Sequence, residues 1–309
     1  MAQIGALGDK IYRSVLLIAA SSILLIVFAI FYMMIQNSMP TIQRFGIGFL
    51  FASEWNPSQQ MYGALPFIYG TVVSSLIAIL IAVPVSLGIA IFLVEQAPAK
   101  VARPIAFMVE LLAAIPSVVY GLWGIFVLAP FIRNHLGPVL QDYLGFLPLF
   151  QGRLTGIGML TGGIILAIMI TPIITAVVRD VLDAVPTTQR EAALALGATK
   201  WETTMVVLGN AASGIAGAVV LGLGRAVGET MAVTMVIGNS PQISASLFEP
   251  AYTIASVLAA NFADATEELY LSALIEMGLV LFLVTLVINA LAKLLIMSVA
   301  NKTNAAKHV

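Results

Sequence analysis

The sequence predicts an all-α integral membrane protein that crosses the bilayer six times. Of the 309 residues, 60% are hydrophobic and only 9% are charged, whereas soluble domains carry about 25% charged residues. Six apolar segments are each long enough for a bilayer core, which needs about 20 residues per helix. Because lipid offers no partners to backbone polar groups, helices are the expected form of these segments.

The six predicted spans differ in their interruptions. The first is too long for the apolar core of a secretory signal peptide. Pro116 interrupts the third span, and Thr171-Pro172 predicts a kink in the fourth. The fifth carries two charged residues in its middle, and the sixth carries one acid. In order, the spans cover residues 14–36, 67–94, 105–132, 156–178, 214–238 and 271–298.

Lys and Arg accumulate on one side of these spans. Of the 14 Lys and Arg residues, Arg225 lies in the middle of a span, ten lie at or beyond the span ends on one side, and three lie on the opposite side. The positive-inside rule makes the richer side cytoplasmic, so both termini and the segment 179–213 are expected there. The ten are Lys10, Arg13, Lys100, Arg103, Arg179, Arg190, Lys200, Lys293, Lys302 and Lys307, and the three are Arg44, Arg133 and Arg153.

The chain is expected to form a single transmembrane domain, 1–309, with core helices in 67–298 and a cytoplasmic loop at 181–213. It contains no cysteine, which excludes disulfides and thiolate metal sites. Its two histidines, His135 and His308, form no cluster, so we expect no metal and no cofactor on this chain. A phosphate-binding Gly-x-x-x-x-Gly-Lys-Ser/Thr loop is absent from the sequence, so we expect any ATP hydrolysis to occur on another subunit.

The segment 187–201 predicts a helix–turn–helix outside the membrane. Thr188 and Glu191 have the spacing of a capping box, and Glu191 to Leu196 consists of strong helix formers. Gly197 suits the left-handed position that ends a helix, and "ATKWETTMVVL" then predicts a second helix. A protruding helix of this kind suits insertion into a partner's groove; an ordinary capped amphipathic loop is the alternative.

This loop resembles the coupling loop of ABC importer permeases, which carries a Glu-Ala-Ala motif. Glu191-Ala192-Ala193 is followed by Gly197, and the loop lies between the fourth and fifth of six predicted spans. In that family the loop docks on the ATPase subunit. The family pattern continues with a Leu-Pro pair, where this chain has Leu208-Gly209. The coupling residues that the resemblance implies are Thr188, Glu191, Ala192, Ala193, Gly197 and Lys200.

Four stretches together resemble the permease subunits of phosphate-specific ABC importers, of the PstC type. They are "GALPFIYGT" (63–71), "LLAAIPSVVYGLWGIFVLAPF" (111–131), "REAALALGATKWE" (190–202) and "GLGRAVGETMAVTMVIGN" (222–239). The resemblance implies the type I ABC importer (MetI-like) permease fold in a bacterial cytoplasmic membrane. It also implies a PstA-type sister permease, two PstB-type ATPase subunits that bind ATP and Mg, and a PstS-type phosphate-binding protein outside the membrane.

Arg225 and Glu229 lie in the middle of the fifth predicted span, where each charge costs on the order of 3 kcal/mol in lipid. Their spacing predicts one shared helix face. One reading is a structural ion pair that holds two permease subunits together. The other places Arg225 on the phosphate path, because Arg keeps its charge and donates hydrogen bonds in a fork. The predicted stripe comprises Ala218, Gly222, Arg225, Glu229, Ala232 and Val236.

The sequence leaves three roles open for Glu229: it orients Arg225, accepts a proton from phosphate, or weakens anion binding so that the ion leaves. Gly224 and Gly228 fit small-residue helix packing better than a nucleotide-binding turn. A broken helix often lines a substrate site, so Ser117 and Tyr120 are candidates for the path; a packing kink is the alternative for this region.

Two further acids lie in apolar segments. Glu276 is expected to be buried and to pair across helices, with Arg225 as the named candidate. Glu110 is expected to reach the cytoplasmic interface.

Two other functions remain open from the sequence. An Arg on the path would also suit another oxyanion, such as phosphonate, sulfate or molybdate. A stand-alone secondary transporter or channel is the rival from another class, but it would have no need of the loop at 187–201.

Overall fold

The computed structural model describes the main chain of residues 2–305 and the side chains of residues 12–294. Lys307 and His308 lie outside the described residues. The described part is helical, with isolated bridges in place of β-strands. The predicted all-α, six-span fold is confirmed, since six helices are long and apolar enough to cross a membrane: Tyr12–Phe45, Leu65–Gln96, Ser117–Leu144, Met159–Asp183, Lys200–Gly228 and Glu268–Leu294.

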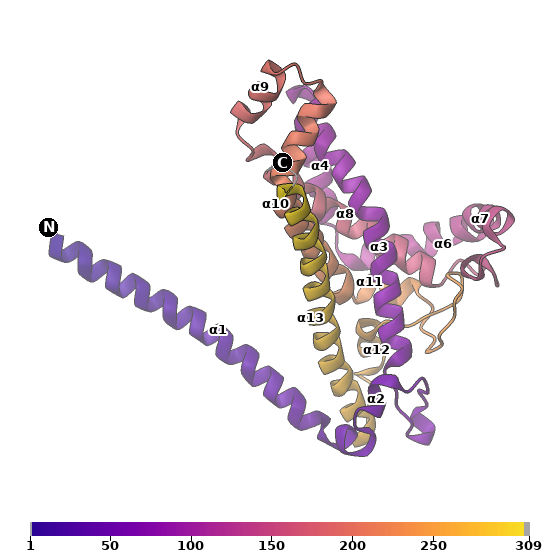
Figure 1. Cartoon of the computed structure of the whole chain (residues 1–309). Coiled ribbons are helices and arrows are strands. Elements are labelled where there is room, and N and C mark those ends of the chain that lie inside the picture. Colours follow the sequence, from indigo (N-terminus) through magenta and orange to yellow (C-terminus); the bar gives the residue numbers. More distant parts are fainter. Residues whose placement is uncertain (1, 306–309) are drawn as a thin grey trace.

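The first helix, α1 (Ala2–Phe45), diverges from the body of the molecule and meets α13 (Glu268–Ala305) near its own C-terminal end (Figure 1). None of its most apolar window is buried. The junction with α13 includes a buried hydrogen bond of 2.7 Å from Thr41 Oγ1 to Ser272 Oγ. An apolar helix without burial in its own chain leaves its faces to lipid or to other subunits.

Three helices form the main core: α3 (Leu65–Ile91), α8 (Met159–Asp183) and α10 (Lys200–Gly228). The central one is α8, with 67% of its apolar window buried. Small residues allow the close approach of α10, because a Cβ on Gly222 would lie 2.6 Å from the side chain of Ile174. The packing role expected for Gly224 and Gly228 is not found within the chain, since a Cβ at either would meet nothing within 4 Å.

A second apolar cluster lies at the end of the molecule opposite α9 (Thr187–Ala195), around α2 (Gly48–Phe51), α12 (Ile254–Asn261) and the start of α13 (Figure 1). A short 3₁₀ turn, η1 (Pro57–Gln59), follows α2. Aromatic rings dominate the cluster, and the ring centroids of Trp55 and Phe67 are 4.9 Å apart.

The third predicted span is misplaced. The segment 105–132 combines the end of a separate helix, α4 (Ala99–Ala113), with the first part of the true span, Ser117–Leu144. Pro116 causes the division, because proline disfavours a helical residue before it and lacks an N–H. The true span alternates α and π turns: α5 (Ser117–Trp123), η3 (Gly124–Leu128), α6 (Ala129–Phe131), η4 (Ile132–Leu136) and α7 (Gly137–Leu144), before the 3₁₀ turn η5 (Pro148–Phe150).

The fifth predicted span, 214–238, is also wrong in its bounds. The helix α10 begins at Lys200 and stops at Gly228, and a short helix, α11 (Met231–Val236), follows the interruption. The interruption arises because Glu229 has an extended backbone, with φ −70° and ψ 128°. Arg225 and Glu229 therefore do not share a continuous helix.

The predicted helix–turn–helix at 187–201 is confirmed in outline. Its first helix is α9, Gly197 has φ +86°, and the second helix is the start of α10. The predicted capping box at Thr188 is wrong, because Pro186 is the N-cap of α9 and supplies no side-chain hydrogen bond. The capping box of this region belongs to α10, where Thr199 and Glu202 exchange hydrogen bonds.

Candidate functional site

The chain is unwound at Glu229 and Thr230, directly after the fifth span ends with the last turn of α10, which carries Arg225. The amide of Glu229 makes a long hydrogen bond of 3.4 Å to the carbonyl oxygen of Ala226. The Thr230 hydroxyl donates to the Gly228 carbonyl oxygen at 3.2 Å. Non-helical backbone at membrane depth is tolerated where it lies against protein or lines a wet cavity, so this interruption is the first candidate for a transport site.

The two charged residues of the interruption point to different partners. The side chain of Arg225 is exposed, whereas Glu229 is half-buried. Glu229 Oε1 accepts a hydrogen bond of 3.5 Å from the amide of Ala232, at the start of α11. Among the side chains of residues 12–294, no ion pair joins Arg225 to Glu229. The guanidinium of Arg225 is therefore available to a group from outside this chain.

The predicted stripe of small residues is divided by the interruption. Ala218 and Gly222 are buried on the α10 side, and Ala232 and Val236 are buried on the α11 side. Gly222 faces Ile174 of α8. The small residues thus pack within this chain, while Arg225 stays exposed beside them.

The interruption at Pro116 lies beside the one at Glu229, because α5 packs against α11. A Cβ on Gly121 would lie 3.2 Å from Cα of Ala232, and one on Gly124 would lie 2.7 Å from the side chain of Val236. Both contacts move toward higher residue numbers on the two segments, so the segments run parallel. The starts of α5 and α11 therefore lie at the same end of this helix pair.

Ser117 and Tyr120 stand on the first turns of α5. Ser117 is half-buried and Tyr120 is buried. The Tyr120 hydroxyl donates to the carbonyl oxygen of Leu112 at 2.8 Å, which ties α5 to the end of α4. The helix α5, which carries Tyr120, packs against α11, which begins directly after the interruption. The structure thus brings Tyr120 near the interruption, although its hydroxyl hydrogen already has a protein acceptor.

The candidate coupling residues gather on the protruding pair formed by α9 and the start of α10. Thr188, Glu191, Ala192, Gly197 and Lys200 are exposed, and Ala193 is half-buried. Large apolar side chains are exposed on the same protrusion: Leu194 at 52%, Leu196 at 89% and Trp201 at 64%. Exposed apolar patches of this kind mark interaction sites, so the tip has the character of a docking surface.

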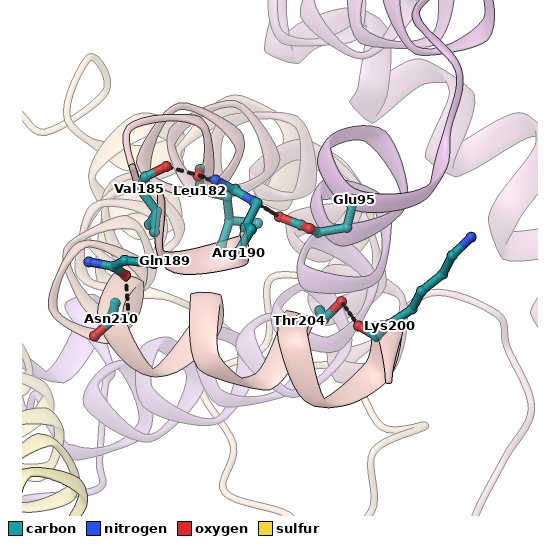
Figure 2. A network of polar contacts seen from close by, with 8 residues as sticks. All are labelled: Glu95, Leu182, Val185, Gln189, Arg190, Lys200, Thr204 and Asn210. Carbon is teal, nitrogen blue, oxygen red and sulfur yellow. Dashed lines mark hydrogen bonds and ion pairs between the residues drawn. The ribbon is translucent and has the colours of Figure 1, made fainter. Parts of the chain in front are cut away.

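An ion pair that was not predicted anchors α9 to the body of the molecule. Figure 2 shows Arg190 between Glu95 and the carbonyl groups at the end of α8. Arg190 Nη2 lies 2.8 Å from Glu95 Oε1, and the two side chains are only 19% and 10% exposed. Sequence reasoning treated Arg190 as one more loop charge, and nothing in its spacing from Glu95 indicated that the two would meet.

The predictions for the two other acids, Glu276 and Glu110, are met only in part. Glu276 is buried on α13, as predicted, and lines a hollow of about 310 Å³ with Ile42 and Leu50. No ion pair to Glu276 occurs among the described side chains, so the suggested pairing with Arg225 is not found. Glu110 pairs with Arg179 at 2.8 Å and its side chain is 50% exposed, while its place at the cytoplasmic interface stays a prediction.

Comparison with known proteins gives a family match and close relatives. Residues 82–301 match the family described as binding-protein-dependent transport system inner membrane component. A relative from Mesorhizobium japonicum, named phosphate transport system permease protein PstC, is 46% identical over 97% of this chain and 93% of its own. A probable PstC from Methanocaldococcus jannaschii is 39% identical over 82% of both chains.

Solved structures share the fold at much lower identity. A chain of the inward-facing MetNI methionine ABC transporter superposes with a TM-score of 0.54 at 16% identity. The alignment covers 81% of this chain and 99% of that one. At this identity the likeness concerns the fold alone, and it agrees with the six-span architecture described above.

Proposed function

Because the chain belongs to the family of inner-membrane components of binding-protein-dependent transport systems, we propose that it is one permease half of an ATP-driven phosphate importer. The observation that carries the proposal is the 46% identity, along 97% of the chain, to a protein named as a phosphate permease. The exposed arginine at the unwound point of the fifth span supports it chemically.

The proposed assembly places the other tasks on other subunits. A PstA-type sister permease would complete the translocation path, two PstB-type subunits would bind ATP and Mg, and a PstS-type protein would deliver phosphate from outside. This chain would carry no cofactor and would not hydrolyse ATP. It would cross the bacterial cytoplasmic membrane with α9 and both termini in the cytoplasm, as the ten-to-three distribution of Lys and Arg supports.

We infer that α9 and the start of α10 dock on an ATPase subunit. The support is the exposed apolar tip, together with the glycine turn that joins the two helices. A rigid helix from Lys200 to Arg225, which is 26 residues, would span about 38 Å, and α10 contains no proline. Movement of the docking loop would therefore be transmitted along α10 to Arg225, near the interruption.

We propose that Arg225 attracts the anion at the interruption. Phosphate needs compensation for its charge in a low-dielectric region, and a guanidinium supplies a permanent charge and several donors. Since Arg225 has no carboxylate partner among the described side chains, its charge is not already neutralised within this chain. Glu229, Ser117 and Tyr120 would shape the same region, with the three roles of Glu229 still open.

The test is uptake by the complete transporter in proteoliposomes, with ATP inside and phosphate-loaded binding protein outside. We expect accumulation of radiolabelled phosphate that requires ATP, the binding protein and all permease subunits. Excess sulfate, molybdate and phosphonate serve as competitors; strong competition by one of them, with weak phosphate uptake, would favour the alternative oxyanion. Uptake by this chain alone, without ATP, would contradict an ABC importer and favour a stand-alone transporter.

A further inference from the structure

Arg190 connects three helices through one guanidinium group. Its Nη2 and Nε atoms donate to Glu95 Oε1 at 2.8 and 3.1 Å. Nη2 also donates to the Leu182 carbonyl oxygen at 3.0 Å, and Nη1 donates to the Val185 carbonyl oxygen at 2.7 Å. The side chain belongs to α9, the Leu182 carbonyl lies in the last turn of α8, the Val185 carbonyl follows that helix, and the carboxylate follows α3 (Figure 2).

The carboxylate partner is held on a short π-helical turn, η2 (Phe92–Gln96), which continues α3. The extra residue in a π turn changes the direction in which the following side chains project, and such turns often occur at functional sites. Glu95 is enclosed there, with 10% of its side chain exposed. Its charge therefore lies in a region where a missing cation is costly.

The helix α9 has little else to hold it against the membrane domain. None of its residues is buried. It enters through Pro186 and leaves through a turn at Gly197, whose backbone is left-handed. A hydrogen bond from Asn210 to Gln189 joins it to α10 (Figure 2). The contacts of Arg190 thus add a side-chain connection from α9 to α8 and α3, beside the covalent link through residues 184–186 and the packing of α9 on α10.

We propose that Glu95 and Arg190 form a mechanical link that carries movement of α9 to α3 and α8, and that they are positioning residues for ATP-coupled transport. This inference rests on the proposed function, in which α9 docks on an ATPase. The fork of Arg190 makes α9 move with the ends of both helices. Since α8 packs against α10 at Gly222, the link gives the docking loop a second route to the region of Arg225.

The test uses the complete transporter in proteoliposomes and compares Glu95→Gln with Glu110→Gln. The control removes a carboxylate whose bond to Arg179 is also 2.8 Å long but which lies between α4 and α8 and is 50% exposed. Phosphate transported per ATP hydrolysed should fall about tenfold in Glu95→Gln, within the usual range of coupling between sites. It should stay within about twofold in the control, because exposed ion pairs contribute little.

Retention of the ATPase subunits distinguishes transmission from a merely structural role. We expect Glu95→Gln to keep its ATPase subunits and its basal ATP hydrolysis. Loss of those subunits would overturn the proposal, because the pair would then only shape the docking helix. Normal transport per ATP in Glu95→Gln would overturn it as well. If the unmodified transporter itself failed to couple ATP to phosphate uptake, the proposed function would have failed instead.

A covalent cross-link in place of the ion pair between Glu95 and Arg190 tests whether the link restores coupling. The chain contains no cysteine, so Glu95→Cys with Arg190→Cys can be bridged by a short bifunctional methanethiosulfonate in an otherwise cysteine-free transporter. We expect the bridged double variant to recover transport per ATP at least about fivefold over the unbridged one, and to lose it again on reduction. Equal coupling before and after bridging would contradict a mechanical link.

Discussion

Arg225 lies in the last turn of α10, three residues before the helix stops at Gly228, and its side chain is exposed. Its isolation from Glu229 could not be predicted from the sequence, because the spacing of four is informative only while the helix continues. The sequence did single out Arg225 as the candidate for the phosphate path, because a charged residue in an apolar segment is easily recognised. The extended backbone of Glu229 lies just before α11, which packs against α5, and no local pattern reveals this contact between segments distant in sequence.

Arg225→Lys tests whether the fork matters in addition to the charge. We predict that phosphate uptake falls at least about tenfold, because an ammonium is a compact charge without the planar set of donors. The complex should still assemble, since Arg225 is exposed in this chain. The measurement is initial uptake in proteoliposomes at matched protein content; unchanged uptake would show that charge alone suffices.

Glu229→Gln tests the neighbouring carboxylate. The amide oxygen of Gln can still accept the hydrogen bond from Ala232 that holds the start of α11. We therefore predict an assembled complex with a smaller loss of uptake than in Arg225→Gln, because this hydrogen bond is kept and Glu229 forms no ion pair with Arg225 among the described side chains. An equal or larger loss would instead assign Glu229 a role in ion release, and uptake rates of both variants decide between these outcomes.

At the scale of elements, the glycines show which features follow from the local sequence and which depend on packing between helices. The turn at Gly197 was predicted because ending a helix in the left-handed region is a local requirement, and its φ of +86° confirms this. The capping box was assigned one helix too early, because Pro186 begins α9 without one. Of the small residues predicted on this helix, Gly222 packs against α8, whereas Gly224 and Gly228 meet nothing within the described part of this chain, because only the position of α8 decides which face of α10 is crowded.

Gly197→Val should weaken docking through the backbone rather than through a clash. A Cβ there would meet nothing within 4 Å, but a left-handed residue with a side chain costs about 1–2 kcal/mol. We predict reduced co-purification of the ATPase subunits with Gly197→Val. Gly197→Asn is the matched control, because Asn tolerates this conformation, and it should retain them; equal retention by both variants would contradict a role for the turn.

Gly222→Ala should separate α10 from α8. The added Cβ would lie 2.6 Å from Ile174, and overpacking of this kind costs about 1–3 kcal/mol. Gly224→Ala is the control, since its Cβ would meet nothing within 4 Å and alanine is the better helix former. Thermal unfolding in detergent should show a lower Tm only for Gly222→Ala, and equal Tm values would contradict the described packing.

At the scale of the whole molecule, the number and class of spans were predictable because apolar length is a property of each segment by itself. Two of the six spans were misplaced, and both contain an interruption that needs neighbours to explain it. The connection between Glu95 and Arg190 was invisible for the same reason, as its partners are 95 residues apart. The most apolar window of α1, unburied in this chain, leaves a face for lipid or another subunit.

Orientation is a prediction at this scale. The ten-to-three distribution of Lys and Arg predicts that α9 lies in the cytoplasm. Thr199 is exposed beside it, and the chain has no cysteine of its own. We predict that Thr199→Cys in intact cells resists an impermeant thiol reagent and reacts only after the membrane is permeabilised. Ready labelling from outside would reverse the proposed topology.

The most direct test of the central claim measures uptake and assembly together for Arg225→Gln. An amide cannot offset the charge of phosphate, so the account predicts lost ATP-dependent uptake in a complex that keeps all its subunits. A structural ion pair predicts otherwise, because removing one partner leaves a buried charge at a cost of about 3–5 kcal/mol. Lost assembly in Arg225→Gln, recovered together with transport in Arg225→Gln/Glu229→Gln, would contradict a place for Arg225 on the phosphate path.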